Sequence, residues 1–189
     1  MLYKLISTFE ELKKYVFIID RGTKGSIIFR FKNENFFHLV GLQYLNIQRF
    51  IPEHIKTKDK QYKHIKKNID KYNNVIENQI KEKDSLELRM NTFLNIIDLL
   101  TGYQTNLYDI KGKNDGSLIN GEYGLLKIYE EIYCFLGLKI DIEKDSVIYC
   151  VPQTWMADRK AYKRVVGKKP LYVKNISKIN KELYNDKIS

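Results

Sequence analysis

Two short runs of apolar, β-branched and aromatic residues near the start of the chain predict a β-hairpin. The runs span residues 15–19 and 26–31, and residues of these types favour the half-buried surface of a strand. Residues 20–25 between the runs include two glycines, which suit a hairpin connection. A short helix over residues 9–15 is expected to lead into the first strand.

A second run of aromatic and branched residues predicts a largely buried helix after this hairpin. Its apolar side chains point almost all round the helical wheel, as in a helix inside a core. Asn33 or Asn35 is expected to cap its start, and Pro52 sets its end at about Phe50. Gly41 costs this helix roughly 1 kcal/mol relative to alanine, and close approach of another element is one reason to tolerate it.

The longest stretch of helical periodicity predicts a lysine-rich αα hairpin at about residues 56–102. Apolar residues recur there at spacings of three and four, with lysines outside the stripe. Asp84 and Glu87 stand at capping-box spacing before the second helix, and Gly102 follows its end. We interpret this pair as a helical insertion that packs on the sheet, with its lysines either on a solvated face or on a binding surface.

The second half of the chain has a pattern typical of strands and loops. Residues 105–121 are polar and contain three glycines, and loops of this length are often functional. The other expected elements are a helical turn near 123–126, a hairpin of 132–142 with 147–151, a strand at 171–173 and a short helix at 176–183.

The order of these elements predicts one α+β domain over residues 1–189. Its antiparallel sheet would consist of an N-terminal and a C-terminal hairpin, packed against a helical layer that includes the αα hairpin. The length and the 43% hydrophobic content suffice for a single buried core. The chain shows no leader-like start and no membrane-length apolar run, so we expect a cytoplasmic protein with no membrane partner.

The two cysteines, Cys134 and Cys150, both lie in apolar runs. If residue 142 pairs with residue 147 in the second hairpin, Cys150 lies opposite Lys139 and not opposite Cys134. We therefore expect two buried free thiols and no disulfide.

Positive charge is concentrated at the C-terminal end. The formal net charge is +10, and residues 156–189 carry 10 Lys/Arg against 3 Asp/Glu, a net +7. Residues 86–155 are net acidic, with 6 Lys/Arg against 10 Asp/Glu. Because a basic surface attracts phosphate backbones through counterion release, this distribution predicts nucleic acid as the partner.

The sequence contains no familiar metal or nucleotide motif. It lacks a phosphate-binding loop and an HExxH sequence, and His38, His54 and His64 do not make a metal-ligand spacing. RNA cleavage needs less, because the 2′-OH of RNA is the nucleophile. The protein then supplies an acid, a base and positive charge at the phosphate. We expect no metal and no cofactor.

His38 and Arg30 are the first candidates for this chemistry. His38 lies in an otherwise apolar helix, where a partly buried imidazole can titrate near neutrality. The alternative is a core histidine sealed by Leu42 and Leu45. Arg30 ends its strand, where it can bind a phosphate or simply be a solvated edge charge.

The basic tail is the second candidate region. Basic residues interleaved with aromatic ones can neutralise phosphates and stack on bases. Trp155 and Tyr162 fit either this role or a place in the core. The candidate substrate-binding residues are Gln153, Arg159, Lys160, Tyr162, Lys163, Arg164 and Lys168.

Two parts of the chain, taken in order, resemble a known nuclease family. They are residues 36–45 (FFHLVGLQYL), and residues 121–126 (GEYGLL) with 149–155 (YCVPQTW). Both are similar to the fourth phage-type branch of the Barnase–EndoU–Colicin–RelE-like (BECR) nucleases, and order and spacing match over most of residues 15–178. His38 matches the histidine of the family's His-Leu-x-Gly-Leu pattern, and Thr154 falls in its Pro-x-Thr/Ser segment. The chain has Gly-Glu-Tyr where the family usually shows Ala-Asp-Tyr, so no role is transferred to Glu122.

The resemblance implies a ribonuclease-like fold, RNA as substrate, and a toxin or phage-conflict role in which a cognate inhibitor protein is a candidate partner. The resulting hypothesis is metal-independent RNA cleavage, with His38 as general base or acid. Arg30 and the tail lysines would stabilise the charged phosphorane, and Thr154 or Gln153 would orient the phosphate. The loop at 105–121 would close over the substrate.

Two alternatives remain open on the sequence. The first is a non-catalytic nucleic-acid- or protein-binding module of phage or mobile-element origin that uses the same basic face. The second is an interaction protein whose helical hairpin contacts another protein.

Overall fold

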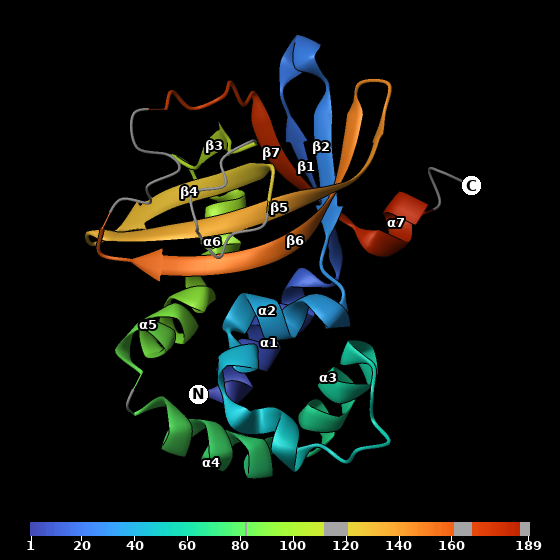
Figure 1. The fold of residues 1–189 in the computed structure, drawn as a ribbon. Helices are drawn as coiled ribbons and strands as arrows, with labels where there is room; N and C mark the ends of the chain where they lie inside the picture. Colours follow the sequence, from blue (N-terminus) through green and yellow to red (C-terminus); the bar gives the residue numbers. More distant parts are fainter. Residues whose placement is uncertain (82, 112–120, 161–167, 186–189) are drawn as a thin grey trace.

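The strands of the described residues form one seven-stranded sheet, which lies above a layer of helices (Figure 1). The structure is a computed structural model that describes residues 1–81, 83–111, 121–160 and 168–185. The strand order across the sheet is β3-β4-β5-β6-β2-β1-β7. The strands are β1 Tyr15–Asp20, β2 Ser26–Arg30, β3 Asn106–Asp109, β4 Tyr123–Tyr129, β5 Ile132–Lys144, β6 Val147–Asp158 and β7 Asn175–Asn180.

The sheet is mixed, so the expectation of a purely antiparallel sheet is wrong. β2 and β6 run parallel, with Ser26 opposite Val147 and Phe29 opposite Cys150. Parallel neighbours need a crossover connection and not a tight turn, and here the chain between β2 and β6 includes the helical layer and β3–β5. The sequence pattern identified the two hairpins, but it did not show that β2 of the first hairpin pairs with β6 of the second.

Irregularities in the β5–β6 pairing bend both strands. Register shifts fall between Gly137 and Leu138 and between Ile140 and Ile142, and such bulges increase local bending and twist. The two long strands therefore belong to two parts of the sheet. One part contains β3 and β4, and the other contains β1, β2 and β7.

The register around the cysteines differs from the expected one because the turn is tighter, with Lys144 and not residue 142 opposite Val147, and the irregularity at Ile140–Ile142 follows it. Cys150 pairs with Ile140, not with Lys139, and Cys134 pairs with Ala157. Both thiols are free and buried, and burial raises the pKa of Cys134 to about 11 and that of Cys150 to about 12. Both are therefore uncharged thiols at neutral pH.

The helices of the described residues are mostly short. They are α1 Leu2–Leu12, α2 Phe36–Val40, α3 Lys58–Lys67, α4 Ile69–Ile80, α5 Asp84–Thr92, α6 Ile96–Thr101 and α7 Lys181–Asn185. Short 3-10 turns connect several of them. Those used below are η3 Leu42–Tyr44, η4 Asn46–Phe50 and η5 Phe93–Asn95.

The buried helix expected to reach Phe50 ends at Val40, so its expected length is wrong. Gly41 takes a left-handed conformation with φ +82° and ends α2, and glycine adopts this conformation without the penalty that a Cβ imposes. The chain continues through η3 and η4. A Cβ at Gly41 would lie 2.5 Å from Cδ1 of Leu86 and 3.3 Å from Cδ of Arg89. Close approach of another element is therefore the reason for this glycine.

The expected αα hairpin consists of four helices. α3 ends at Lys67, because the φ of −118° and ψ of 41° at the next residue, Asn68, are not helical. The 3-10 turn η5 separates α5 from α6. The apolar stripe nevertheless faces inward, and Tyr62, Tyr72 and Met90 are buried. The chain bends at these points so that the stripe follows the rest of the core.

Three expected elements of the second half are also different. The turn predicted near 123–126 is the start of strand β4, and residues 176–180 of the last helix expected at 176–183 belong to β7, which pairs with β1. Leu171 forms only an isolated bridge with Leu107. Both β4 and β7 gain their hydrogen bonds from strands distant in the sequence, which local periodicity does not reveal.

Candidate functional site

The second half of β6 lies at a free edge of the sheet. β2 pairs with Val147–Cys150 and ends one residue later, so residues 151–158 have β5 as their strand partner. The helices α2 and α5 both contact β6 from below the sheet. Figure 1 shows α5 below the end of this strand. The edge of the sheet and the two helices therefore enclose a region in which side chains from three elements meet.

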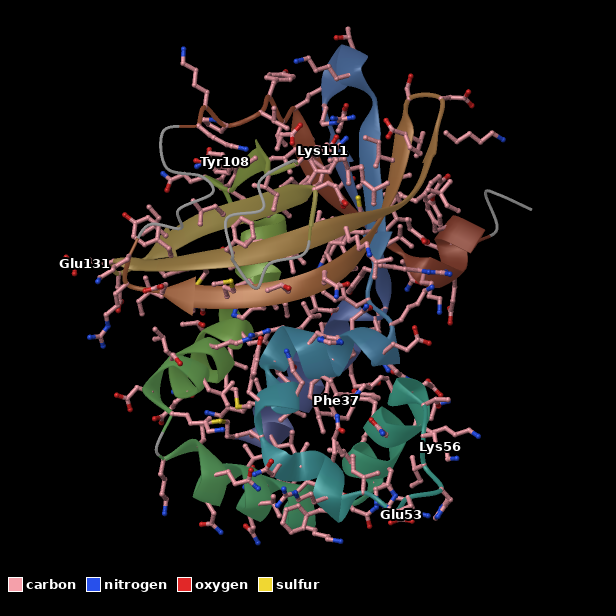
Figure 2. All side chains as sticks on the ribbon, in the orientation of Figure 1. Phe37, Glu53, Lys56, Tyr108, Lys111 and Glu131 are labelled. Carbon is pink, nitrogen blue, oxygen red and sulfur yellow. The ribbon has the colours of Figure 1, made fainter. Side chains whose placement is uncertain are left out.

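His38 is the exposed residue of α2. The other four residues of the helix are buried, and Phe37 lies among the helices below the sheet (Figure 2). The alternative of a core histidine sealed by Leu42 and Leu45 is therefore wrong. The backbone of His38 is fixed by the core, while its imidazole is accessible to solvent.

Two cations beside His38 act on its protonation. Partial desolvation lowers its pKa from the ordinary value, and the charges of Lys58 and Arg89 lower it further. Lys58 Nζ lies 4.8 Å from the centroid of the Phe37 ring, next to His38 in α2. The lowered pKa favours the neutral imidazole, which has a free lone pair on one ring nitrogen.

Arg89 connects α5 to the end of α2. Its Nη2 donates a hydrogen bond to the carbonyl of His38, and its Nε donates one to the carbonyl of Leu39 at 3.1 Å. The guanidinium carbon lies 5.6 Å from the centroid of the Tyr44 ring. These carbonyls belong to a helix that ends at Gly41, and the missing Cβ of that glycine leaves room for the arginine stem.

A hollow of ≈ 740 Å³ lies beside Arg89 and the free edge of β6. Thr154 belongs to its wall, as do η3 and the first turn of α5. The lining residues are Tyr44, Lys83, Asp84, Ser85, Leu86, Arg89, Thr154, Met156, Ala157 and Asp158. Arg89 thus contacts the backbone of His38 and also lines the hollow to which Thr154 belongs, whereas His38 is not among the residues that line the hollow.

Arg30 lies elsewhere. It is exposed at the end of β2 and lines two other hollows, of ≈ 580 and ≈ 270 Å³. The larger is rich in lysines (Lys13, Lys14, Lys32 and Lys181), with Glu10, Glu34 and Asp59 also present. The smaller includes Tyr149 and Tyr184. Arg30 is therefore not brought into the hollow that Thr154 lines.

The predicted tail residues are spread over several places. Gln153 is half-buried at the β5–β6 irregularity, and Arg159 and Lys160 are exposed beyond β6. Lys168 Nζ donates to the carbonyl of Asp109. Tyr162, Lys163 and Arg164 lie outside the described residues. Trp155 is fully buried, with its ring edge-on to Phe93, so it belongs to the core.

A cationic cluster on the opposite side of the sheet was not predicted. Arg21 and Lys111 both lie over the ring of Tyr123, at 5.6 and 5.2 Å from its centroid, and Figure 2 shows Lys111 above β4 and β5. The backbone N–H of Ile140 donates to Glu122 at 2.7 Å, so this carboxylate has a structural contact. The turn position of Arg21 gave no sign of the cluster.

Arg89 was missed as well, although the sequence contains a signal for it. It lies three residues after Leu86 and four before Phe93, on the apolar face of its helix. A charged residue on a buried face is rare unless it is paired. That position could have marked Arg89 before the structure was known.

The chain belongs to a family of phage-type nucleases of the BECR class. The family model described as phage-Barnase-EndoU-ColicinE5/D-RelE like nuclease4 matches residues 2–188, which confirms the resemblance noted from the sequence. Searches of curated proteins and of solved structures find no match. Membership in a nuclease family implies nucleic acid as the substrate.

Two further observations concern metals and membranes. In the described part of the chain, no three His, Cys, Asp or Glu side chains gather closely enough to hold a metal ion. Within the same residues, no helix has the length and apolar character needed to cross a bilayer.

Proposed function

We propose that this protein is a metal-independent endoribonuclease that cleaves RNA where α2 and α5 meet the free edge of β6. The observation that carries the proposal is the position of His38, exposed on a rigid helix end beside Arg89 and close to the hollow that Thr154 lines. Family membership supports nucleic acid as the substrate. RNA is the substrate that contains its own nucleophile.

His38 acts as the general base in this proposal. Its lowered pKa favours the neutral imidazole, which can accept the proton of a ribose 2′-OH. The 2′-oxygen then attacks the adjacent phosphorus, and the bond from phosphorus to the 5′-oxygen breaks. Water supplies the proton to the leaving 5′-oxygen, and the imidazolium later returns its proton to solvent. The products are a 2′,3′-cyclic phosphate and a 5′-hydroxyl.

Thr154 and Gln153 orient the phosphate by hydrogen bonding. Both are half-buried on β6, so each can present a polar group while the strand fixes its position. Because Arg30 lies outside the hollow, we assign it, with Arg159, Lys160 and Lys168, to nucleotides that flank the cleaved bond. Such contacts position the substrate and steer it electrostatically.

The biological setting that we propose is phage conflict or toxicity inside the cytoplasm, with RNA as target and a cognate inhibitor protein as partner. The support is the phage-type family and the basic chain. An inhibitor that covered His38 and the hollow would block the site directly.

Cleavage of total RNA in EDTA tests the enzymatic proposal. We expect wild type to cleave, and His38→Ala to lose about 10²- to 10⁴-fold in rate, the usual contribution of a general base. His54→Ala is the matched control, because His54 is an exposed histidine away from the hollow. Wild-type products should end in 2′,3′-cyclic phosphate, and Arg30→Ala should cleave more weakly than wild type.

The same experiment separates the alternatives. Equal cleavage by wild type and His38→Ala would overturn the site assignment. Salt-sensitive RNA binding without any cleavage by wild type would favour the non-catalytic binding module.

A further inference from the structure

Arg89 carries a buried positive charge that forms no ion pair with an acidic side chain of the described residues. Its side chain is about nine-tenths buried, with 9% exposure. The ion pairs among the described residues do not include it. Desolvation lowers its pKa, and Tyr44 acts in the opposite direction. A buried cation of this kind is costly unless an anion or hydrogen-bond acceptors compensate for it.

The partners of Arg89 leave donor capacity unused. A guanidinium has five N–H groups; Arg89 donates to the carbonyls of His38 and Leu39 and also hydrogen-bonds the side chain of Tyr44, which leaves part of the five for a ligand. These bonds fix the plane of the Arg89 guanidinium group. A planar fork with free N–H groups matches two oxygens of a phosphate, and Arg89 lines an open hollow from which such a group can approach.

The hollow has the size and the aromatic wall of a nucleotide site. Its ≈ 740 Å³ lies within the roughly 300–1,000 Å³ typical of small-molecule sites. Tyr44 is 45% exposed and forms part of the wall, and its backbone carbonyl accepts a hydrogen bond from Lys83 Nζ at 2.7 Å. An accessible ring beside a fixed guanidinium provides a stacking surface next to a phosphate contact.

The charges around the hollow restrict what it can accept. Its exposed charged lining residues are Asp84, Asp158 and Lys83, whereas Arg89 is buried. Asp158 accepts a hydrogen bond from the backbone of Lys160 at 3.0 Å. Several phosphates in a row would meet both carboxylates and be repelled. One nucleotide with its phosphate on Arg89 avoids this repulsion, and its base can donate hydrogen bonds to a carboxylate.

We propose that this hollow binds a single nucleotide of a single-stranded RNA substrate, with its phosphodiester on Arg89 and its base stacked on Tyr44. The inference rests on the proposed function and adds to it, because it assigns phosphate binding to Arg89. The bonds of Arg89 to the His38 and Leu39 carbonyls place the nucleotide beside the proposed base. Arg89 thus binds substrate and positions His38 at the same time.

Binding to an uncleavable probe tests this inference apart from catalysis. The probe is a fluorescein-labelled decaribonucleotide with 2′-O-methyl groups throughout, followed by anisotropy in EDTA between 50 and 200 mM KCl. Tyr44→Ala should weaken binding by about 5- to 150-fold, the usual loss for one base–aromatic stack. Tyr103→Ala is the matched control, because Tyr103 is 94% exposed and lies outside the hollow, and its affinity should equal that of wild type.

Arg89→Met and Arg89→Lys test the phosphate contact. Loss of one phosphate contact reduces the slope of log affinity against log salt by about 0.7 for a single strand. We expect this reduction in Arg89→Met, while Arg89→Lys retains the slope but binds more weakly because the fork is lost. If Arg89→Met does not fold, Tyr44→Ala and Thr154→Val still test the site, since both alter exposed or half-buried positions.

The outcomes separate this inference from the proposed function. If wild type cleaves RNA but Tyr44→Ala and Arg89→Met bind like wild type with the same slope, the nucleotide site is wrong and the nuclease stands. If binding responds as expected without cleavage, the nucleotide site stands and the enzymatic proposal fails. Equal affinity of all variants and wild type for the probe overturns the inference whatever the cleavage result.

Discussion

The two halves of β6 differ in their neighbours. Val147–Cys150 pairs with β5 on one side and β2 on the other, whereas residues 151–158 pair, among the described strands, with β5 alone. Both halves bury side chains in the same core, Cys150 in the first and Trp155 in the second. Both edges of the first half are occupied by backbone hydrogen bonds to neighbouring strands. Beside the second half the end of β2 leaves space, which α2, α5 and the hollow occupy.

This difference indicates how the fold creates a candidate site without a sequence motif. A strand paired on both sides offers little room for a ligand at its edge, while an edge bordered by helices leaves side chains accessible. Thr154, at the free edge, lines the hollow beside Arg89. The two halves of β6 are therefore expected to differ both in their contribution to stability and in their chemistry.

The largest expected effect is on stability, from Trp155→Ala. Trp155 has 0% exposure, and its ring lies 5.9 Å from that of Phe93. Removing a buried aromatic of this size costs about 3–5 kcal/mol of unfolding free energy. Urea denaturation measures the loss. Tyr149→Ala in the first half is the control, because Tyr149 is 36% exposed, and a loss as large there would contradict the comparison.

A smaller loss is expected from Gly41→Ala. The left-handed φ costs a residue with Cβ about 1–2 kcal/mol, and the clash with Leu86 and Arg89 adds overpacking of about 1–3 kcal/mol. Gly22→Ala is the control, because Gly22 has a φ of +63° but its nearest new contact is at 3.5 Å, with Tyr172. Guanidinium denaturation gives the loss of unfolding free energy in each variant. The loss in Gly41→Ala beyond that in Gly22→Ala is the cost of displacing Arg89 and Leu86. Equal losses would mean that the close approach is unimportant.

The smallest effect concerns the protonation of His38. Removing the charge of Lys58, as in Lys58→Met, should raise the His38 pKa toward its ordinary value, because a neighbouring cation lowers it. An NMR titration measures the shift, and the acid limb of RNA cleavage should move to higher pH with it. Lys60→Met is the control on the same helix, since Lys60 does not contribute to the His38 pKa.

Because the pKa of His38 is lowered in the folded protein, the free energy of unfolding depends on pH. Between its folded pKa and the unfolded value of about 6.5, the unfolded chain binds more protons than the folded chain. Stability therefore rises with pH through this window and falls as the pH drops below about 6.5. His38→Gln should flatten this dependence in denaturation curves recorded between pH 5 and 7. An unchanged curve would show that His38 does not titrate with a lowered pKa.

The N-terminal hairpin was accessible from the sequence because its pairing is local. Strand-forming runs separated by a short glycine-containing connection set β1 and β2 side by side. The second hairpin was found in the same way, but its register was wrong from the turn onward, because residue type alone did not show that the turn is short enough to place Lys144 opposite Val147. The helix through Gly41 was overextended, since periodicity does not show where a glycine turns left-handed.

The candidate site was only partly accessible. His38 was singled out as a polar residue in an apolar helix, but the sequence left open whether it is buried or exposed. Arg30 and Thr154 were assigned to one site, yet they line separate hollows. Arg89 was missed because its contacts, to residues fifty and fifty-one positions away, leave no local pattern.

The sequence by itself determined the local strand runs, the apolar helix faces, the basic end of the chain and the resemblance to a nuclease family. These properties depend on residue type, on short spacings and on motif order. Tertiary structure decided that β2 lies parallel to β6 and pairs only with its first four residues among the described strands, and that Arg89 reaches the carbonyls of His38 and Leu39. Both depend on contacts between distant residues, whose geometry is set by packing of the whole core and not by any one segment.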